Sequence, residues 1–115
     1  MAEAIGGEPQ PADLEQRRRY HLAAVFASNY TTQMLVMAKE VLDREKLDFD
    51  LLKPLVVQSV NKILDIGPEQ ALTGPAKRRD YATLEAHKEL LDFNENLAEI
   101  YEQISQYIIE SQYYK

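Results

Sequence analysis

The sequence predicts an all-α protein, a helical bundle in which the first helix is long. Apolar residues recur every three or four positions through four segments, which is the spacing of one helix face. No segment sustains an alternation of apolar and polar residues, so the sequence predicts no strand. Glycine and proline gather between the segments, at Gly67-Pro68 and Thr73-Gly74-Pro75, where they predict turns.

The first helix is expected to begin after Asp13, whose carboxylate can accept a backbone N–H of the first turn. Its pattern runs to about Lys46, roughly 50 Å at 1.5 Å per residue. Residues 1–12 hold two of the four glycines and two of the five prolines, and indicate a flexible lead-in or a severed interdomain linker. The expected core stripe of the helix consists of Ala23, Ala27, Tyr30, Met34, Met37 and Val41.

The run from Leu22 to Ala27 exceeds what a small bundle needs. It is apolar all round the helix, and a helix of that kind is buried on every side. Four helices in 115 residues can cover only part of it. We therefore expect the first helix to meet another chain or another domain, and a homodimer formed through this helix is the first expectation.

Three shorter helices follow. The second is expected to begin at Asp48 or Asp50, with Pro54 near its start. Asp80 is placed to cap the third, and Asn94 can cap the fourth. The inward residues are expected to be Leu84, His87, Leu90 and Leu91 in the third helix, and Leu97, Ile100, Tyr101, Ile104, Tyr107 and Ile108 in the fourth.

The composition of the chain excludes several classes of function. A chain of 115 residues suits one domain, expected over residues 13–112. The formal net charge of -6 argues against general nucleic-acid binding, and the lack of cysteine removes thiolate chemistry. No apolar run approaches the roughly 18 residues that span a bilayer, and the N-terminus lacks the features of a signal peptide. The expectation is a cytoplasmic protein that contacts neither membrane nor nucleic acid.

Polar residues interrupt the middle of the first helix. Ser28, Asn29 and Thr32 lie in a run of indifferent helix formers, away from the expected core stripe. One interpretation is a surface that hydrogen-bonds a substrate across a cleft. The other is that these side chains bond neighbouring helices or water.

The segment ALTGPAKRRD, residues 71–80, is the second candidate surface. Gly74 can take a positive φ, Pro75 can begin a short helical turn, and Thr73 could cap it. Three cations follow, of which Arg79 directly precedes the helix cap Asp80. The segment is either a connector with solvated charges or a rigid loop that presents cations to an anionic ligand.

Complete catalytic motifs are missing from the sequence. His21 and His87 are the only histidines and neither sits in an HExxH pattern, so no metal site is predicted. His87 is expected to pack and hydrogen-bond within the bundle. Neither GxGxxG nor GxxxxGK[ST] occurs, so the chain has no self-contained nucleotide site and is not expected to be an enzyme on its own.

Several stretches together are specific: HLAAVFASNY (21–30), ALTGPAKRRD (71–80), His87 and YEQIS (101–105). They resemble the C-terminal helical domain, a domain of unknown function, that follows a Rossmann domain in a family of NAD(P)-binding oxidoreductases. That family is similar to ketopantoate reductase, pyrroline-5-carboxylate reductase and the 3-hydroxyacid dehydrogenases, and the domain is similar to the C-terminal domain of 6-phosphogluconate-dehydrogenase-like proteins. The resemblance covers about residues 13–110.

The resemblance implies a dimerisation and substrate-cleft domain whose Rossmann partner is absent from this chain and carries NAD or NADP. It implies a cleft lined by the long first helix and the turn, with Ser28, Asn29, Thr32, Thr73, Gly74, Pro75, Arg79 and His87 as candidates. The sequence departs from the hydroxyacid dehydrogenases at Val25, where those enzymes place a lysine four residues before an asparagine, so the catalytic residues stay open. The alternative is a stand-alone helical module that binds a protein partner.

Overall fold

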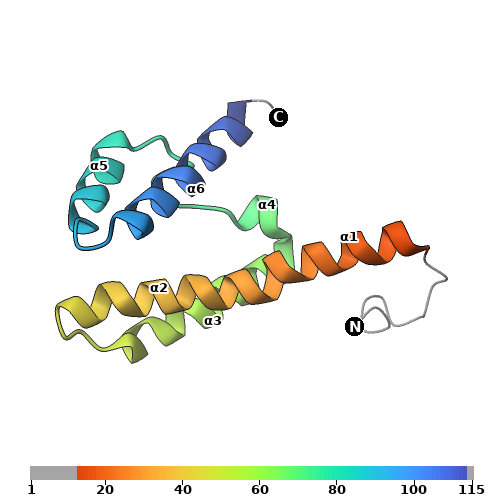
Figure 1. Ribbon diagram of the computed structural model, residues 1–115, viewed down its shortest axis with the longest axis horizontal. Helices are drawn as coiled ribbons and strands as arrows, with labels where there is room; N and C mark the ends of the chain where they lie inside the picture. The colour runs from red at the N-terminus through yellow and green to blue at the C-terminus, as the bar shows by residue number, and fades with distance from the viewer. Residues whose placement is uncertain (1–12, 114–115) are drawn as a thin grey trace. The chain divides into compact units, whose positions relative to one another are not determined.

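The computed structural model describes residues 13–113 and contains two compact units, Met1–Arg44 and Glu45–Lys115. Every regular element in the described part of the chain is a helix (Figure 1). The predicted all-α class is thereby confirmed. The expected single domain over residues 13–112 stays a prediction.

The described part of the first unit is one long helix. It consists of α1 (Leu14–Ala24), a π-helical segment (Val25–Tyr30) and α2 (Thr31–Arg44), which Figure 1 draws as one continuous coil. Asp13 caps it as predicted: its carboxylate accepts the Gln16 N–H at 2.8 Å, and the Gln16 side chain accepts the Asp13 N–H at 3.2 Å. This reciprocal capping box satisfies two backbone donors that the first turn would otherwise leave unpaired.

The prediction that the apolar stripe of the first helix is buried is wrong within this unit. None of the residues described in this unit is buried, and Tyr30, Met34 and Val41 keep 51%, 42% and 38% of their surface exposed. The physical reason is that a single helix has no second element within its own unit against which to pack. That the apolar pattern marks a contact face stays a prediction, because none of its residues is buried within the unit.

The second unit opens with a 3-10 turn, Phe49–Leu52, and α3 (Lys53–Ile66). Asp48 caps the turn by accepting the Asp50 N–H at 2.9 Å, and Pro54 stands in the first turn of α3, where its missing N–H costs nothing. Gly67 ends α3 with a φ of 91°. A four-residue helix follows, α4 (Pro68–Ala71), which the sequence did not predict.

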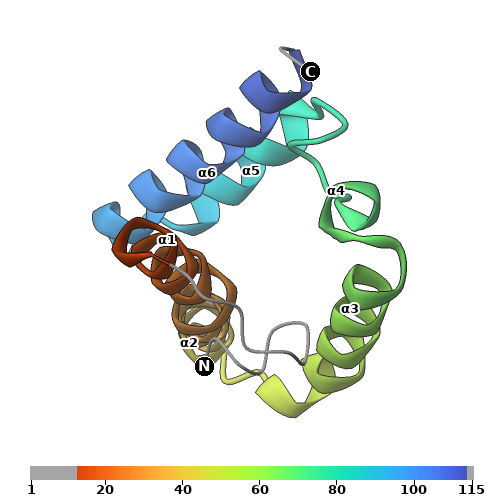
Figure 2. The same cartoon turned by 90° about the vertical axis from the view of Figure 1, so that its right-hand side faces the viewer.

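Two antiparallel helices complete the unit, α5 (Tyr81–Leu90) and α6 (Glu95–Tyr113), which lie side by side in both views (Figures 1 and 2). Asp80 and Asn94 cap them as predicted, accepting the N–H groups of Thr83 and Leu97. The buried apolar residues of the described chain are Ala76, Leu84, Leu91, Leu97 and Ile109. The core therefore belongs to this hairpin and the turn that precedes it.

The predicted faces of the hairpin need correction. Leu90 is 70% exposed and Tyr107 is 74% exposed, whereas Ile109 is buried. Ile100 and Ile104 are exposed as well, at 41% and 39%. A helix that packs against one neighbour buries only a narrow stripe, so the broad apolar surface of α6 is split between a contact side and an open side.

Among the described helices, none combines the length and the apolar character that crossing a bilayer requires.

Candidate functional site

The predicted polar surface coincides with a change in helix type. Ser28 and Asn29 lie in the π-helical segment Val25–Tyr30, and Thr32 follows it directly. The hydroxyl groups of Thr31 and Thr32 donate to the carbonyls of Ala27 and Ser28, both at 3.0 Å. Such back-bonding distorts the regular helical ladder. Single π-helical turns are rare and often mark functional sites.

An aromatic pair flanks the same surface. The rings of Phe26 and Tyr30 meet edge to face with centroids 5.3 Å apart, and both residues are more than half exposed. Ser28, Asn29 and Thr32 are exposed too. We call residues 25–32 the mid-helix surface. It combines apolar rings with hydroxyl and amide groups, the mixture that small-molecule and protein contacts use.

Residues 74–80, here called the basic turn, are closed by the hydrogen bonds of a helix C-terminal motif. The Asp80 N–H donates to the Pro75 carbonyl at 2.9 Å, and the Arg79 N–H donates to the Ala76 carbonyl at 3.1 Å. These are the two hydrogen bonds of a Schellman motif, in which the second-last residue takes a left-handed conformation. Here that residue is Arg79, with a φ of 56°, and Gly74 enters the turn at 110°.

A buried side chain fixes this turn to the hairpin. Ala76 is 6% exposed and forms the core cluster with Leu84 of α5 and Ile109 of α6. The three candidates Thr73, Gly74 and Pro75 precede it directly. Two features therefore hold the turn in place, its own backbone hydrogen bonds and the buried Ala76 side chain.

The start of α5 carries a perturbed carboxyl group. The Thr83 hydroxyl donates to Asp80 at 2.7 Å and the Thr83 N–H donates at 3.2 Å, and these two bonds hold the pKa of Asp80 below its ordinary value. The charges of Arg78 and His87 lower this pKa further.

His87 makes the expected bond within the fold. Its Nδ1 lies 2.7 Å from the Tyr101 hydroxyl, and the two rings meet edge to face with centroids 5.7 Å apart. Partial burial raises the pKa of Tyr101. Beside them, Lys88 bonds Glu102 at 2.6 Å and Glu85 at 2.9 Å, and these partners raise its pKa.

The candidates therefore form two groups. Thr73, Gly74, Pro75 and Arg79 lie in one turn-rich segment, and His87 lies on α5 in the same unit. Ser28, Asn29 and Thr32 share one helix in the other unit. The sequence did not single out Tyr101 as a partner of His87 or Lys88 as a link between helices. Tyr101 and Lys88 each lie 14 positions from the residue they bond, so no short-range sequence pattern predicts these contacts.

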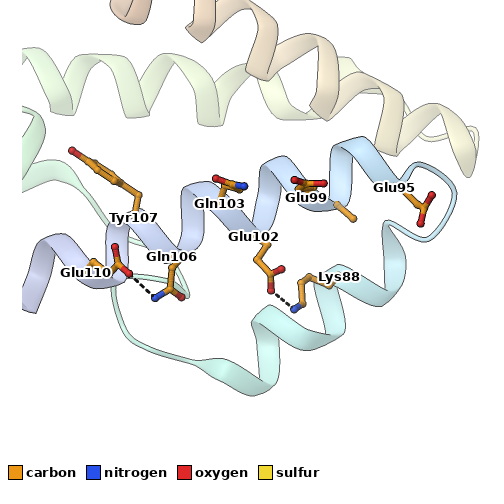
Figure 3. A pocket seen from close by; sticks show the side chains of 9 residues that line it. Lys88, Glu95, Glu99, Glu102, Gln103, Gln106, Tyr107 and Glu110 are labelled. Carbon is orange, nitrogen blue, oxygen red and sulfur yellow. Dashed lines mark hydrogen bonds and ion pairs between the residues drawn. The ribbon is translucent and has the colours of Figure 1, made fainter.

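An open hollow of about 760 Å³ runs along α6, and none of the candidate site residues lines it (Figure 3). Carboxylates dominate it, among them Glu95, Glu99 and Glu110, and dashed lines in Figure 3 mark the bonds Lys88–Glu102 and Gln106–Glu110. Within residues 13–113, no three histidine, cysteine or acidic residues form a group that could hold a metal ion. The glutamates that line the hollow are all exposed.

Comparison with protein families matches residues 1–108 to the domain of unknown function DUF2520. The chain belongs to this family. The DUF2520 domain is also similar to a solved structure, that of a "putative NADP oxidoreductase" from Bacteroides fragilis, with a TM-score of 0.83 and 38% sequence identity. The match covers 86% of the DUF2520 chain and 38% of the Bacteroides fragilis chain, so the domain spans well under half the length of that protein. No curated protein matches it.

These findings associate the DUF2520 domain with oxidoreductases. The resemblance expected from the sequence is thus confirmed at that level.

Proposed function

We propose that this chain is the dimerisation and substrate-cleft domain of an NAD(P)-dependent oxidoreductase-like protein and is not catalytic alone. The observation that supports the proposal most is the 38% sequence identity to a protein named as an NADP oxidoreductase. The match covers 38% of the length of that protein. At that identity the fold and the broad role of a domain are commonly kept. A kinship with ketopantoate reductase, pyrroline-5-carboxylate reductase and the 3-hydroxyacid dehydrogenases belongs to the same proposal.

The nucleotide is assigned to a different part of the full-length protein. Nucleotide phosphates are usually held by a glycine-rich loop at a helix N-terminus, and this sequence contains neither GxGxxG nor GxxxxGK[ST]. The name of the Bacteroides fragilis protein favours NADP over NAD.

Two surfaces of this chain are assigned to the substrate side. Ser28, Asn29 and Thr32 supply hydroxyl and amide groups on the mid-helix surface, where the π-helical segment marks an irregularity typical of functional sites. The turn from Thr73 to Arg79 supplies positive charge on a rigid backbone, which suits an anionic substrate or a cofactor phosphate. His87 lies on α5, the helix that follows this turn, and completes the set.

Calorimetric titration with NADPH, NADP and their NAD counterparts tests the assignment. The 115-residue chain is expected to bind none of them, while a full-length family member binds NADPH at micromolar concentration. Micromolar binding by this chain alone would overturn the proposal. Full-length family members that bind no nucleotide would favour the alternative, a helical module that binds a protein partner.

A further inference from the structure

A small hollow in the second unit has a composition unlike the rest of the acidic surface. It has a volume of about 240 Å³ and lies between one face of α3 and the end of α4 with the residues that follow it. Its α3 side comprises Leu55, Gln58, Ser59, Lys62 and Ile63, at helical spacings of three, one, three and one. Ala71 and Thr73 close the other side.

The polar groups of the hollow are mostly donors and include no carboxylate. Lys62 offers three N–H donors, while Ser59 and Thr73 each offer a hydroxyl group. The hollow thus carries one positive charge in a chain whose formal net charge is -6. Among the residues that the structure describes, none forms a hydrogen bond or an ion pair with the side chains of Ser59, Lys62 or Thr73. Together with the Gln58 amide, these exposed side chains give the hollow four polar groups.

Three apolar side chains complete the wall. Leu55 and Ile63 lie one turn to either side of Ser59 along α3, and Ala71 lies opposite. The volume equals that of about eight water molecules in the liquid, which suits a small organic acid and is too small for a nucleotide. One cation matches one negative charge, whereas phosphate recognition usually recruits arginine forks or several backbone N–H groups.

We infer that this hollow binds a small monocarboxylate with a short branched apolar tail. The carboxylate pairs with the Lys62 ammonium and accepts from the Ser59 and Thr73 hydroxyls, and the tail lies against Leu55 and Ile63. Thr73 connects the hollow to the basic turn, so an acid bound here contacts the residue that begins the candidate loop. The inference goes beyond the proposed function, because the site lies wholly in the second unit and needs no nucleotide.

Chemical-shift titration of the ¹⁵N-labelled 115-residue chain tests the inference, with 4-methylpentanoate as the probe. Saturable shifts are expected at the amides of Ser59, Lys62 and Thr73, with a dissociation constant on the order of 1 mM for so small a ligand. The matched uncharged probe, 4-methylpentanamide, is expected to bind at least about tenfold more weakly, because it cannot form the charge-assisted contact. Inorganic phosphate, which has no tail, is expected to produce no saturable shift at these positions.

Two lysine variants on α3 separate the hollow from general electrostatics. Lys62→Gln removes the proposed partner and is expected to weaken binding about tenfold. Lys53→Gln removes the same charge from the same helix but outside the hollow, where Lys53 pairs with Asp50 at 3.0 Å, and is expected to leave binding unchanged. Both lysines are exposed, and circular dichroism of each variant checks that the helices are retained.

Four results would overturn the inference. They are an absence of saturation by 4-methylpentanoate, equal binding of the amide, equal binding of phosphate, and an equal loss of affinity in Lys53→Gln and Lys62→Gln. None of them affects the nucleotide titration, so the two proposals fail separately.

Discussion

At the scale of single residues, Arg79 occupies a position that its side chain does not favour. A left-handed residue closes the Schellman motif, and glycine is the usual choice because any Cβ is strained there. Backbone conformation alone therefore does not explain why this position holds an arginine. Under the proposed function, the reason is the guanidinium group.

Two substitutions at Arg79 separate backbone from side chain. Both Arg79→Gly and Arg79→Ala remove the guanidinium, but only glycine relieves the strain, so the glycine variant is expected to be about 0.5–1 kcal/mol more stable than the alanine variant. In a full-length family member, both are expected to weaken substrate or cofactor binding by about 1–3 kcal/mol. Thermal melts and binding titrations measure the two effects. A loss of stability in both variants with unchanged binding would make Arg79 a purely structural residue.

Asp80 is expected to make the stability of the chain fall at acidic pH. Its folded-state pKa lies below the ordinary 3.8, because the Thr83 hydroxyl and N–H bond its charged form. Its stabilisation of α5 is therefore fully present above that ordinary value and is lost as the pH falls through the folded-state pKa. Asp80→Asn keeps a capping side chain without a titratable charge.

The melting temperature of the unsubstituted chain is accordingly expected to exceed that of Asp80→Asn near neutral pH. The difference should shrink on acidification between about pH 5 and about pH 2. Differential scanning calorimetry over that range checks it. Asp48→Asn is the control, since Asp48 also caps a turn but lies outside the hairpin. A difference between Asp80→Asn and the parent that does not change with pH would contradict the assignment.

At the scale of elements, α5 offers a matched pair of leucines. Leu84 is 8% exposed and packs with Ala76 and Ile109, whereas Leu90 is 70% exposed on the same helix. Leu84→Ala is expected to cost about 2–5 kcal/mol of unfolding free energy, and Leu90→Ala about 0.5 kcal/mol or less. Urea unfolding followed by circular dichroism measures both. Equal costs would show that Leu90 is covered in solution, for example by a second copy of the chain.

The same pair shows what could be predicted from the sequence. Helix starts at Asp13, Asp80 and Asn94 were predictable because a cap is a local arrangement of a side chain and a nearby N–H. The buried side of each helix was not, because periodicity gives a stripe but not the neighbour that covers it. Leu90 and Leu84 belong to one apolar pattern and differ only in whether α6 lies against them.

The candidate site divides in the same way. Gly74 could be recognised from its residue type, since positive φ favours glycine. The left-handed Arg79, the partner Tyr101 and the π-helical segment could not, because each depends on hydrogen bonds between groups that the residue types alone do not specify.

At the scale of the whole molecule, the main feature is that large apolar side chains of the first helix are exposed. Leu22 and Phe26 are 58% and 61% exposed in the run that is apolar all round the helix. A surface of this kind usually meets another protein. We therefore propose a homodimer in which the first helix is central, and obligate dimers of this kind typically bury more than about 2,000 Å².

Light scattering at low micromolar concentration is expected to give twice the 13.2 kDa mass of one chain. Leu22→Glu places a charge in the proposed interface and is expected to return the mass to that of one chain. Leu14→Glu is the matched control, since Leu14 is 59% exposed on the same helix but lies outside the run, and it should leave the dimer intact. A monodisperse monomer of the unsubstituted chain would instead assign the run to contact with another domain.

The concentration of the buried core in the α5–α6 hairpin has a consequence for genetics. Loss-of-function alleles in a comprehensive mutational screen of a full-length family member should sort into two phenotypes. Alleles at Ala76, Leu84, Leu91, Leu97 and Ile109 should reduce protein abundance, because they unfold the hairpin. Alleles between Leu22 and Thr32 should leave abundance nearly normal and abolish activity. A cell can carry two defective copies of the gene, one from each class. Activity should then return only to the extent that the two protein products form mixed assemblies.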